Sequence, residues 1–293
     1  MNYDTLCLSG AGTSGFSFIS CINFLEEKNI LNIKNIKRFV GTSIGSIISF
    51  FLLLGYTTND LKKFCFNFNF NKFEQEINSE KFLLNYGLND GSNILIFIQT
   101  FLKNKINKHD ITFKELHELI NKDIFIITTN YSKCQEEVFN HIKTPNMSVI
   151  KAIRKSISLP FFFTPVYYNN DIYIDGGFTN NLGVNYCNPS TTLIISSHGT
   201  FNENPKNIFD YINGLFVIIQ KLINEKDLNE KFNENIINVT GIKFTFSPTS
   251  EDLTNLWNNG IKITKNFIDN NYKIFCKEII KDIVEEAINT NKD

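Results

Sequence analysis

The chain has 293 residues, of which 42% are hydrophobic and 20% are charged, as in ordinary globular proteins with a substantial buried core. A formal net charge of −1 argues against a nucleic-acid partner, which would require a strongly basic surface. The six cysteines are widely spaced and form no C-x-x-C pair, so they favour free thiols in a reducing compartment over disulfides or a zinc site.

The first part of the chain alternates short strands and helices. Strands are predicted over 3–9 and 36–42, and each leads into a helix, over about 15–28 and over 43–54. This alternation predicts an α/β domain with a largely parallel sheet. The following region, 57–108, has a helical and irregular pattern.

The rest of the chain adds further strands and helices. Thr112 and Glu115 form a capping-box signal at the start of a helix, and the stretch 147–166 is predicted as a helix broken at Pro160. The remaining predicted elements are strands over 123–131, 171–177 and 191–197, and helices over about 205–232, 250–270 and 273–290. No repeat or Pro/Gly/Ser-rich linker interrupts the chain, which favours a single domain over 1–293.

Two windows without charge, 5–25 and 39–59, approach the length of a membrane span. Both are interrupted by Gly, Ser and Thr, and each divides into a short strand and a short helix, so they favour buried core. The apolar stripe of the last predicted helix, Ile279, Ile280, Ile283, Val284, Ala287 and Ile288, also favours core packing. The start of the chain lacks the positive region of a signal peptide. We therefore expect a soluble cytoplasmic protein without a transmembrane helix.

The stretch GTSIG at 41–45 has the form G-x-S-x-G and lies between a predicted strand and a predicted helix. In that context Ser43 would lie on a sharp turn, with its hydroxyl exposed near the positive end of a helix. A small polar residue that only caps the helix is the alternative. Ser43, Asp175 and His198 follow the order of an α/β-hydrolase triad, but the elbow of that fold comes later in its sheet, which argues against it.

A second motif, LSGAGTSG at 8–15, follows a strand and opens a helix, so its backbone N–H groups are placed to bind an anion. A dinucleotide fingerprint fits only as Gly10-x-Gly12-x-x-Gly15, and no acidic residue follows the next strand to hold a ribose. A third motif, Asp175 followed by two glycines, comes at the end of a predicted strand and is by itself a common turn.

Together the three motifs resemble one family. LCLSGAGTSG, GTSIGS and YIDGG are similar to the glycine-rich loop, nucleophile elbow and Asp-Gly-Gly of the patatin-like phospholipases. AIRKSISLPFFFTPV and FTNNLGV resemble the stretches on either side of that family's aspartate. Order and spacing agree over about residues 5–185. The resemblance therefore implies one patatin-like domain of three α/β/α layers with a central, mostly parallel sheet, and the later helices are compatible with it.

The resemblance implies a lipid acyl hydrolase of the phospholipase A type, with Ser43 as nucleophile and Asp175 as base. The oxyanion would be held by backbone N–H groups around Gly10, Ala11 and Gly12. The turns would be supported by the glycines of the three motifs, Gly15, Gly41, Gly45, Gly176 and Gly177. A carboxylate with its ordinary pKa near 4 is a weak base, so Asp175 is expected to be partly desolvated.

Two residues depart from the family pattern. Ser14 stands where members usually carry Arg or Lys, and Ala11 stands where they usually carry Gly, which would restrict the loop if it requires a positive φ. A weak or inactive lipid-binding module and an acyltransferase therefore remain alternatives. The phenylalanine-rich stretches, 64–73 and 160–163, would line an acyl channel, touch a bilayer or pack in the core. We expect a lipid-ester substrate, transient contact with a membrane surface, and no cofactor, calcium or other metal.

Overall fold

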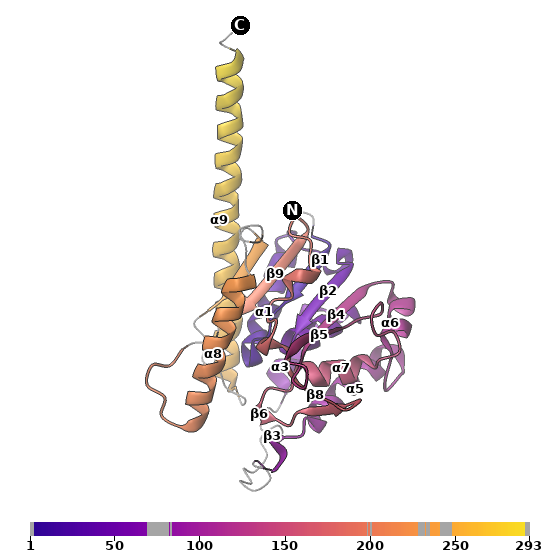
Figure 1. Ribbon diagram of the computed structural model, residues 1–293. Coiled ribbons are helices and arrows are strands. Elements are labelled where there is room, and N and C mark those ends of the chain that lie inside the picture. The colour runs from indigo at the N-terminus through magenta and orange to yellow at the C-terminus, as the bar shows by residue number, and fades with distance from the viewer. Residues whose placement is uncertain are drawn as a thin grey trace.

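The computed structural model describes residues 3–68, 82, 84–197, 199, 201–227, 232, 235–240 and 248–290, with the side chains of the last helix described as far as Tyr272. Within these residues a sheet of eight strands forms the centre of the molecule, in the order β10-β9-β1-β2-β4-β8-β7, with β5 paired to β4 (Figure 1). The predicted α/β fold with a mostly parallel central sheet is confirmed.

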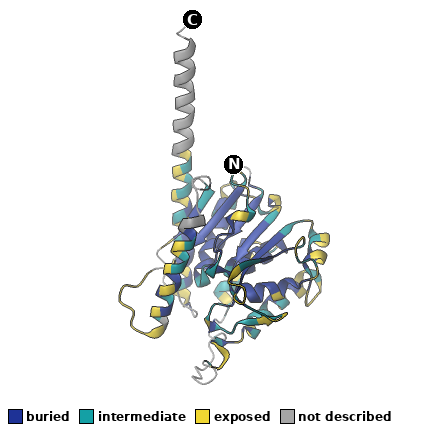
Figure 2. Cartoon of the chain, viewed as in Figure 1, coloured by how far each residue is buried: buried dark blue, intermediate teal, exposed yellow. Residues whose placement is uncertain are grey.

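The sheet has a parallel block and an antiparallel end. The parallel strands are β1 (Thr5–Leu8), β2 (Arg38–Thr42), β4 (Asp123–Asn130), β9 (Thr192–Ser197) and β10 (Ile236–Val239). The strands β5 (Gln135–Phe139), β7 (Val166–Tyr168) and β8 (Asp171–Asp175) pair antiparallel. A separate two-stranded sheet joins β3 (Gly87–Asn89) to β6 (Phe161–Phe163). Figure 2 shows that the central strands are almost entirely buried.

Helices connect and cover these strands. The described α-helices are α1 (Gly15–Glu27), α2 (Ile44–Leu53), α3 (Thr58–Asn67), α5 (Ser92–Ile106), α6 (Phe113–Ile120), α7 (Val149–Ser156), α8 (Ile208–Asp227) and α9 (Ser250–Thr290). Short 3-10 turns lie at η1 (Gly12–Ser14), η2 (Ile33–Asn35), η4 (Gly176–Phe178) and η5 (Val184–Tyr186). The predicted capping box is present at α6, where Thr112 Oγ1 accepts from the Glu115 N–H at 3.2 Å and the Glu115 carboxylate accepts from the Thr112 N–H.

The core divides between the two faces of the sheet because side chains alternate along each strand. Leu6 and Leu8 of β1 pack into the larger cluster, together with residues of α1, α2 and α9. Cys7, between them, belongs to a smaller cluster on the opposite face, which contains Leu182 and Val184. One face is thus covered by long helices, and the segment around η5 packs on the other.

Three differences separate the predicted elements from the observed ones. The helix predicted over 147–166 ends at Ser156, before Pro160, and β6 and β7 follow it. The two helices predicted over 250–270 and 273–290 are one continuous helix, α9. The strands β3, β5 and β10 were not predicted, because each is short and depends on a neighbouring strand for its hydrogen bonds.

Other expectations concern residues that the structure describes only in part. The side chains of the apolar stripe on 279–288 lie beyond those that the structure describes. None of the helices within the described part combines the length and apolar character that crossing a membrane requires. The cysteines whose side chains are described, Cys7, Cys21, Cys65, Cys134 and Cys187, are free thiols. The single domain over 1–293 stays a prediction.

Candidate active site

Ser43 lies at the turn from β2 into α2, in a backbone conformation that L-residues rarely adopt. Its φ is 54° and its ψ is −127°, a strained combination that is typical of a nucleophile elbow. Two glycines make the turn sterically feasible. A Cβ on Gly41 would lie 2.6 Å from Ser46 Cα, and a Cβ on Gly45 would overlap the carbonyl oxygen of Leu8 in β1.

The Ser43 hydroxyl donates a hydrogen bond of 2.6 Å to Asp175 Oδ2. The two residues are distant in the chain, and β4 brings them together. Thr42, just before the serine, pairs with Ile127, and Asp175 pairs with the next β4 residue, Thr128. Gly176 is required here as well, because a Cβ on it would overlap the Ile127 carbonyl and lie 3.0 Å from Thr42 Cγ2.

Asp175 is only 3% exposed. Burial raises its pKa from 3.8 to about 6, because desolvation disfavours the charged carboxylate. Hydrogen bonds from the Ser43 hydroxyl and from the Gly177 N–H, at 2.8 Å to Oδ1, oppose this rise. The carboxylate is therefore ionised at neutral pH and is a stronger base than an exposed aspartate.

Ser156 holds the backbone of the turn in place. Its hydroxyl accepts from the Ser43 N–H at 2.8 Å and donates to the Ile127 carbonyl at 2.6 Å. Sequence reasoning did not single out Ser156, although it lies in the stretch AIRKSISLP that the family resemblance included. The signal was a small polar residue at the end of a helix, which has many structural uses.

The glycine-rich loop lies directly beside the elbow. The Gly10 N–H donates to Asn181 Oδ1 at 3.0 Å, and a Cβ on Gly10 would lie 3.3 Å from Ser43 Cβ. Within the described residues no acceptor is found for the N–H of Ala11, the N-cap of η1, or of Gly12, its first residue. Asn181 was also missed by sequence reasoning, since it acts across the fold.

The two departures from the family pattern have different outcomes. Ala11 has a φ of −156°, so the loop places no left-handed residue there, and the positive φ of 53° falls on Gly12 instead. The alanine side chain therefore does not restrict the backbone of the glycine loop. Ser14 is buried at 3% exposure and belongs to η1. Gly15 packs against Ile44, where a Cβ would lie 2.7 Å from the Ile44 side chain.

Ser43, Asp175 and the glycine loop line one cavity of about 250 Å³. Its walls are largely apolar, from Ile44, Ile47, Ile48 and Phe51 of α2, Phe64 and Phe68 near α3, Phe97 of α5, Phe163 of β6, and Phe216 and Val217 of α8. The residues of the two phenylalanine-rich stretches therefore do not all have the same position. Phe64, Phe68 and Phe163 line the cavity, whereas Phe162 packs against α8 and residues 69–73 lie outside the described part.

No histidine is among the described residues that line this cavity. His117 and His141 lie together elsewhere, against Asp123. His198, the third member of the alternative triad, lies outside the described residues. The arrangement that the described residues form is a serine, a buried carboxylate and a pair of backbone donors, which is suited to acyl transfer through an acyl-serine.

Sequence comparisons extend these observations. Residues 6–187 match the family described as patatin-like phospholipase. A protein of Invertebrate iridescent virus 6, "Probable lipid hydrolase 463L", is 33% identical over 189 residues, and the alignment covers 62% of this chain and 62% of the viral protein. The uncharacterized protein R571 of Acanthamoeba polyphaga mimivirus is 27% identical over 240 residues, 78% of this chain and 79% of that protein.

Solved structures share the architecture. VipD from Legionella pneumophila superposes with a TM-score of 0.62 at 19% identity, covering 92% of this chain and 67% of VipD. ExoU from Pseudomonas aeruginosa superposes with a TM-score of 0.53 at 15% identity, covering 92% of this chain and 52% of ExoU. The chain therefore spans about half the length of ExoU, and at these identities the likeness concerns the fold.

Proposed function

Because this chain belongs to the patatin-like phospholipase family, we propose that it is a lipid hydrolase that cleaves fatty-acyl esters of phospholipids. The observation that carries the proposal is the 2.6 Å hydrogen bond from Ser43 Oγ to the buried carboxylate of Asp175, inside an apolar cavity. A serine placed only to cap α2 would use its side chain on the helix, yet Ser43 makes no side-chain capping bond.

In the proposed mechanism Asp175 takes the proton of the Ser43 hydroxyl as Oγ attacks the ester carbonyl carbon. The carbonyl oxygen becomes an oxyanion, which the N–H groups of Ala11 and Gly12 stabilise. Gly10 contributes its N–H if the bond to Asn181 opens. Collapse of the intermediate breaks the ester bond, and the proton on Asp175 passes to the departing alcohol. Water then attacks the acyl-serine and gives one proton to Asp175. Collapse of this second intermediate breaks the bond to Ser43 Oγ, Asp175 returns the proton to Oγ, and the fatty acid is released.

The cavity walls favour the acyl part of the substrate over its head group. The aliphatic and aromatic side chains described above bury a hydrocarbon chain without leaving polar groups unpaired. No lysine or arginine is among the described residues that line the cavity, so it offers a phosphate no cationic partner there. We infer that the acyl chain enters the cavity and that the head group remains toward its mouth.

Transient contact with a lipid surface is part of this proposal. Helix α8 contributes Phe216 and Val217 to the cavity, and it presents a stripe of apolar residues to solvent. The stripe comprises Ile208, Tyr211, Leu215, Ile218 and Leu222, which are between 42% and 62% exposed. An amphipathic helix of this kind inserts its apolar face at a bilayer boundary. One helix would thus face both the lipid and the cavity.

The testing experiment measures fatty-acid release from mixed phospholipid vesicles with no calcium added. Ser43→Ala and Asp175→Asn are compared with the wild type, and Ser190→Ala is the control because Ser190 is an exposed serine in a turn. We expect release by the wild type and the control, and loss of about 10⁴-fold or more in Ser43→Ala.

The same samples distinguish the alternatives. One outcome is that a serine-reactive phosphonate labels Ser43 while no fatty acid is released in the absence of an acceptor alcohol. That result would contradict phospholipid hydrolysis. Transfer of the acyl group to an added alcohol in place of water would indicate an acyltransferase. Lipid binding without labelling or turnover would indicate a binding module.

A further inference from the structure

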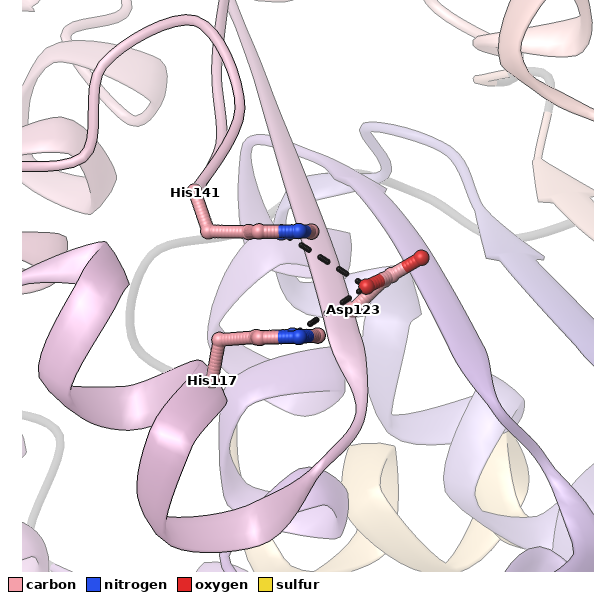
Figure 3. A group of neighbouring side chains, drawn as sticks. All are labelled: His117, Asp123 and His141. Atoms are coloured by element: carbon pink, nitrogen blue, oxygen red, sulfur yellow. Dashed lines mark ion pairs between the residues drawn. The ribbon is translucent and has the colours of Figure 1, made fainter.

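A second cluster of polar side chains lies at the opposite end of the sheet from Ser43. His117 is in the last turn of α6, Asp123 begins β4, and His141 follows β5 (Figure 3). Both imidazoles turn their Nδ1 atoms toward the same carboxylate oxygen. Three segments of the chain therefore converge on one point, which the proposed hydrolase mechanism does not use.

The distances in this cluster match those between ligands of a single small metal ion. His117 Nδ1 lies 3.3 Å from Asp123 Oδ1, and His141 Nδ1 lies 3.5 Å from the same oxygen. The donor atoms of all three side chains lie within 4.8 Å of one another. In a tetrahedral zinc site with bonds of about 2.0–2.1 Å, neighbouring ligand atoms are roughly 3.3 Å apart. His117 Nδ1 is also within hydrogen-bond distance of the Lys122 carbonyl oxygen, at 3.2 Å. Because a carbonyl only accepts, this contact needs a proton on Nδ1 and must be given up when Nδ1 binds an ion.

The cluster is incompletely satisfied by the protein itself. The Nδ1 atom of His141 is buried and has no hydrogen-bond partner among the described residues, although a carboxylate oxygen lies nearby. A buried polar atom without a partner costs free energy, so it requires an explanation. The two imidazole rings are stacked, with centroids 3.8 Å apart and planes at 3° to each other. A cation between the Nδ1 atoms and the carboxylate would give the His141 Nδ1 atom a partner.

A neighbouring side chain orients the Asp123 carboxylate toward the two imidazoles. Arg38 Nη2 lies 3.2 Å from Asp123 Oδ2, which leaves Oδ1 facing the imidazoles. Such a partner orients a ligating carboxylate from behind. The positive charge of Arg38 also weakens the affinity for a cation.

We propose that His117, Asp123 and His141 bind one divalent transition-metal ion of the zinc type. Two imidazoles and a carboxylate suit zinc, nickel or copper, whereas calcium and magnesium prefer sites built from oxygen alone. Two parallel rings cannot both direct an in-plane lone pair at one ion, so at least one ring must rotate on binding. His141 can rotate without losing a hydrogen bond from Nδ1, since that atom makes none.

The position of the site gives the ion a structural role. Asp123 pairs in register with Arg38 at the start of β2, and Ser43 follows the other end of that strand. At about 3.3 Å per residue, the five residues of β2 separate the two sites by roughly 16 Å. The ion would link α6, the start of β4 and the segment after β5. This proposal departs from the expectation that the chain binds no metal, and it is independent of the proposed lipid hydrolysis.

The test uses the full chain after dialysis against a chelator, titrated with Co²⁺ and with Zn²⁺. Co²⁺ reports its ligands by its visible absorption, and calorimetry measures Zn²⁺ affinity and stoichiometry. His117→Gln and His141→Gln remove one ligand each, and His109→Gln is the control because His109 is an exposed histidine just before α6. Circular dichroism confirms that each variant is folded.

We expect one bound ion, with a tetrahedral Co²⁺ spectrum that lacks thiolate bands, in the wild type and in His109→Gln. Affinity should fall at least about tenfold in His117→Gln and in His141→Gln. Equal affinity in all four proteins would overturn the proposal, as would absence of binding to the wild type. Thiolate-to-cobalt absorption would also overturn it, because it would place the ion on cysteines.

Discussion

The two ends of the central sheet contain the same kind of side chain in contrasting surroundings. At one end Asp175 is buried beside Ser43, and burial raises its pKa to about 6. At the other end the Asp123 side chain is 21% exposed, is paired with Arg38 and faces two imidazoles. One carboxylate has a hydroxyl beside it, and the other has two imidazole rings beside it.

This difference shows that residue type alone does not determine the chemistry of a strand-end aspartate. Desolvation makes Asp175 basic, because among the described residues its charge is stabilised by the Ser43 hydroxyl and the Gly177 N–H and by no cationic side chain. Asp123 is accessible to solvent and turns Oδ1 toward the imidazoles, whereas Arg38 binds its other oxygen, Oδ2. The following predictions test the contrast, beginning with the largest expected effect.

Replacing Asp175 with Asn should abolish catalysis and stabilise the fold at the same time. We expect fatty-acid release to fall about 10⁴-fold, because the base is lost. The raised pKa means that the folded protein holds the Asp175 proton more tightly than the unfolded chain does. That contribution to stability is therefore present below pH 3.8 and is lost as the pH rises through about 6.

At pH 7 the asparagine variant should therefore gain up to about 3 kcal/mol in the free energy of unfolding, measured with urea. The gain should disappear toward pH 4. Asp171→Asn, at the half-buried start of the same strand, is the control. It removes the ion pair of Asp171 with Lys133 and should keep its activity. A destabilised Asp175→Asn variant would contradict the assignment of desolvation as the main cause of the raised pKa.

The pH dependence of the wild type should report the Asp175 ionisation directly. The base must be deprotonated, so kcat/KM should rise with pH, reach half its maximum near pH 6, and level off above it. Below pH 6 the rate should fall about tenfold per pH unit. A short soluble ester avoids effects of pH on vesicles. A rate that is constant between pH 4.5 and 7 would show that Asp175 does not act as the base.

Gly45 tests how closely the elbow must approach β1. An alanine side chain there would overlap Leu8 O and lie 2.6 Å from Ser9 O, so Gly45→Ala should destabilise the protein by about 1–3 kcal/mol and reduce activity. Gly214→Ala, within α8, is the matched control. Its Cβ would lie 3.6 Å from the Phe201 side chain, which is an ordinary van der Waals distance. The control should be neutral or stabilising, by up to about 1 kcal/mol. Equal melting temperatures for the two variants would refute the proposed close approach.

Removal of metal should have the smallest effect on catalysis. After treatment with a chelator we expect the rate of fatty-acid release at 25 °C to change by less than about twofold, since the proposed ion lies roughly 16 Å from Ser43. The melting temperature should fall and should recover when Zn²⁺ is added back. Loss of activity on chelation, with restoration by Zn²⁺, would place the ion in the catalytic site instead.

The sequence alone determined the features that depend on neighbouring residues. Gly41, Ser43 and Gly45 predict a tight strand-to-helix turn because only small residues fit there, and the capping box at Thr112 predicts the start of α6. The pattern of strands and helices also predicted the α/β class. The catalytic roles of Ser43 and Asp175 remain proposals, although the structure brings their side chains together.

Only the tertiary structure decided which distant groups meet. Ser156 contacts Ser43 across 113 positions of the chain, and Asn181 contacts Gly10 across 171. The basicity of Asp175 depends on how completely the fold buries it, and burial is a property of the packed whole. The spacing of His117, Asp123 and His141 along the sequence does not match a metal-binding motif. They come from three separate segments of the chain, which only the fold brings together. Local patterns specify turns and caps, whereas desolvation and long-range contacts arise only when the elements pack together.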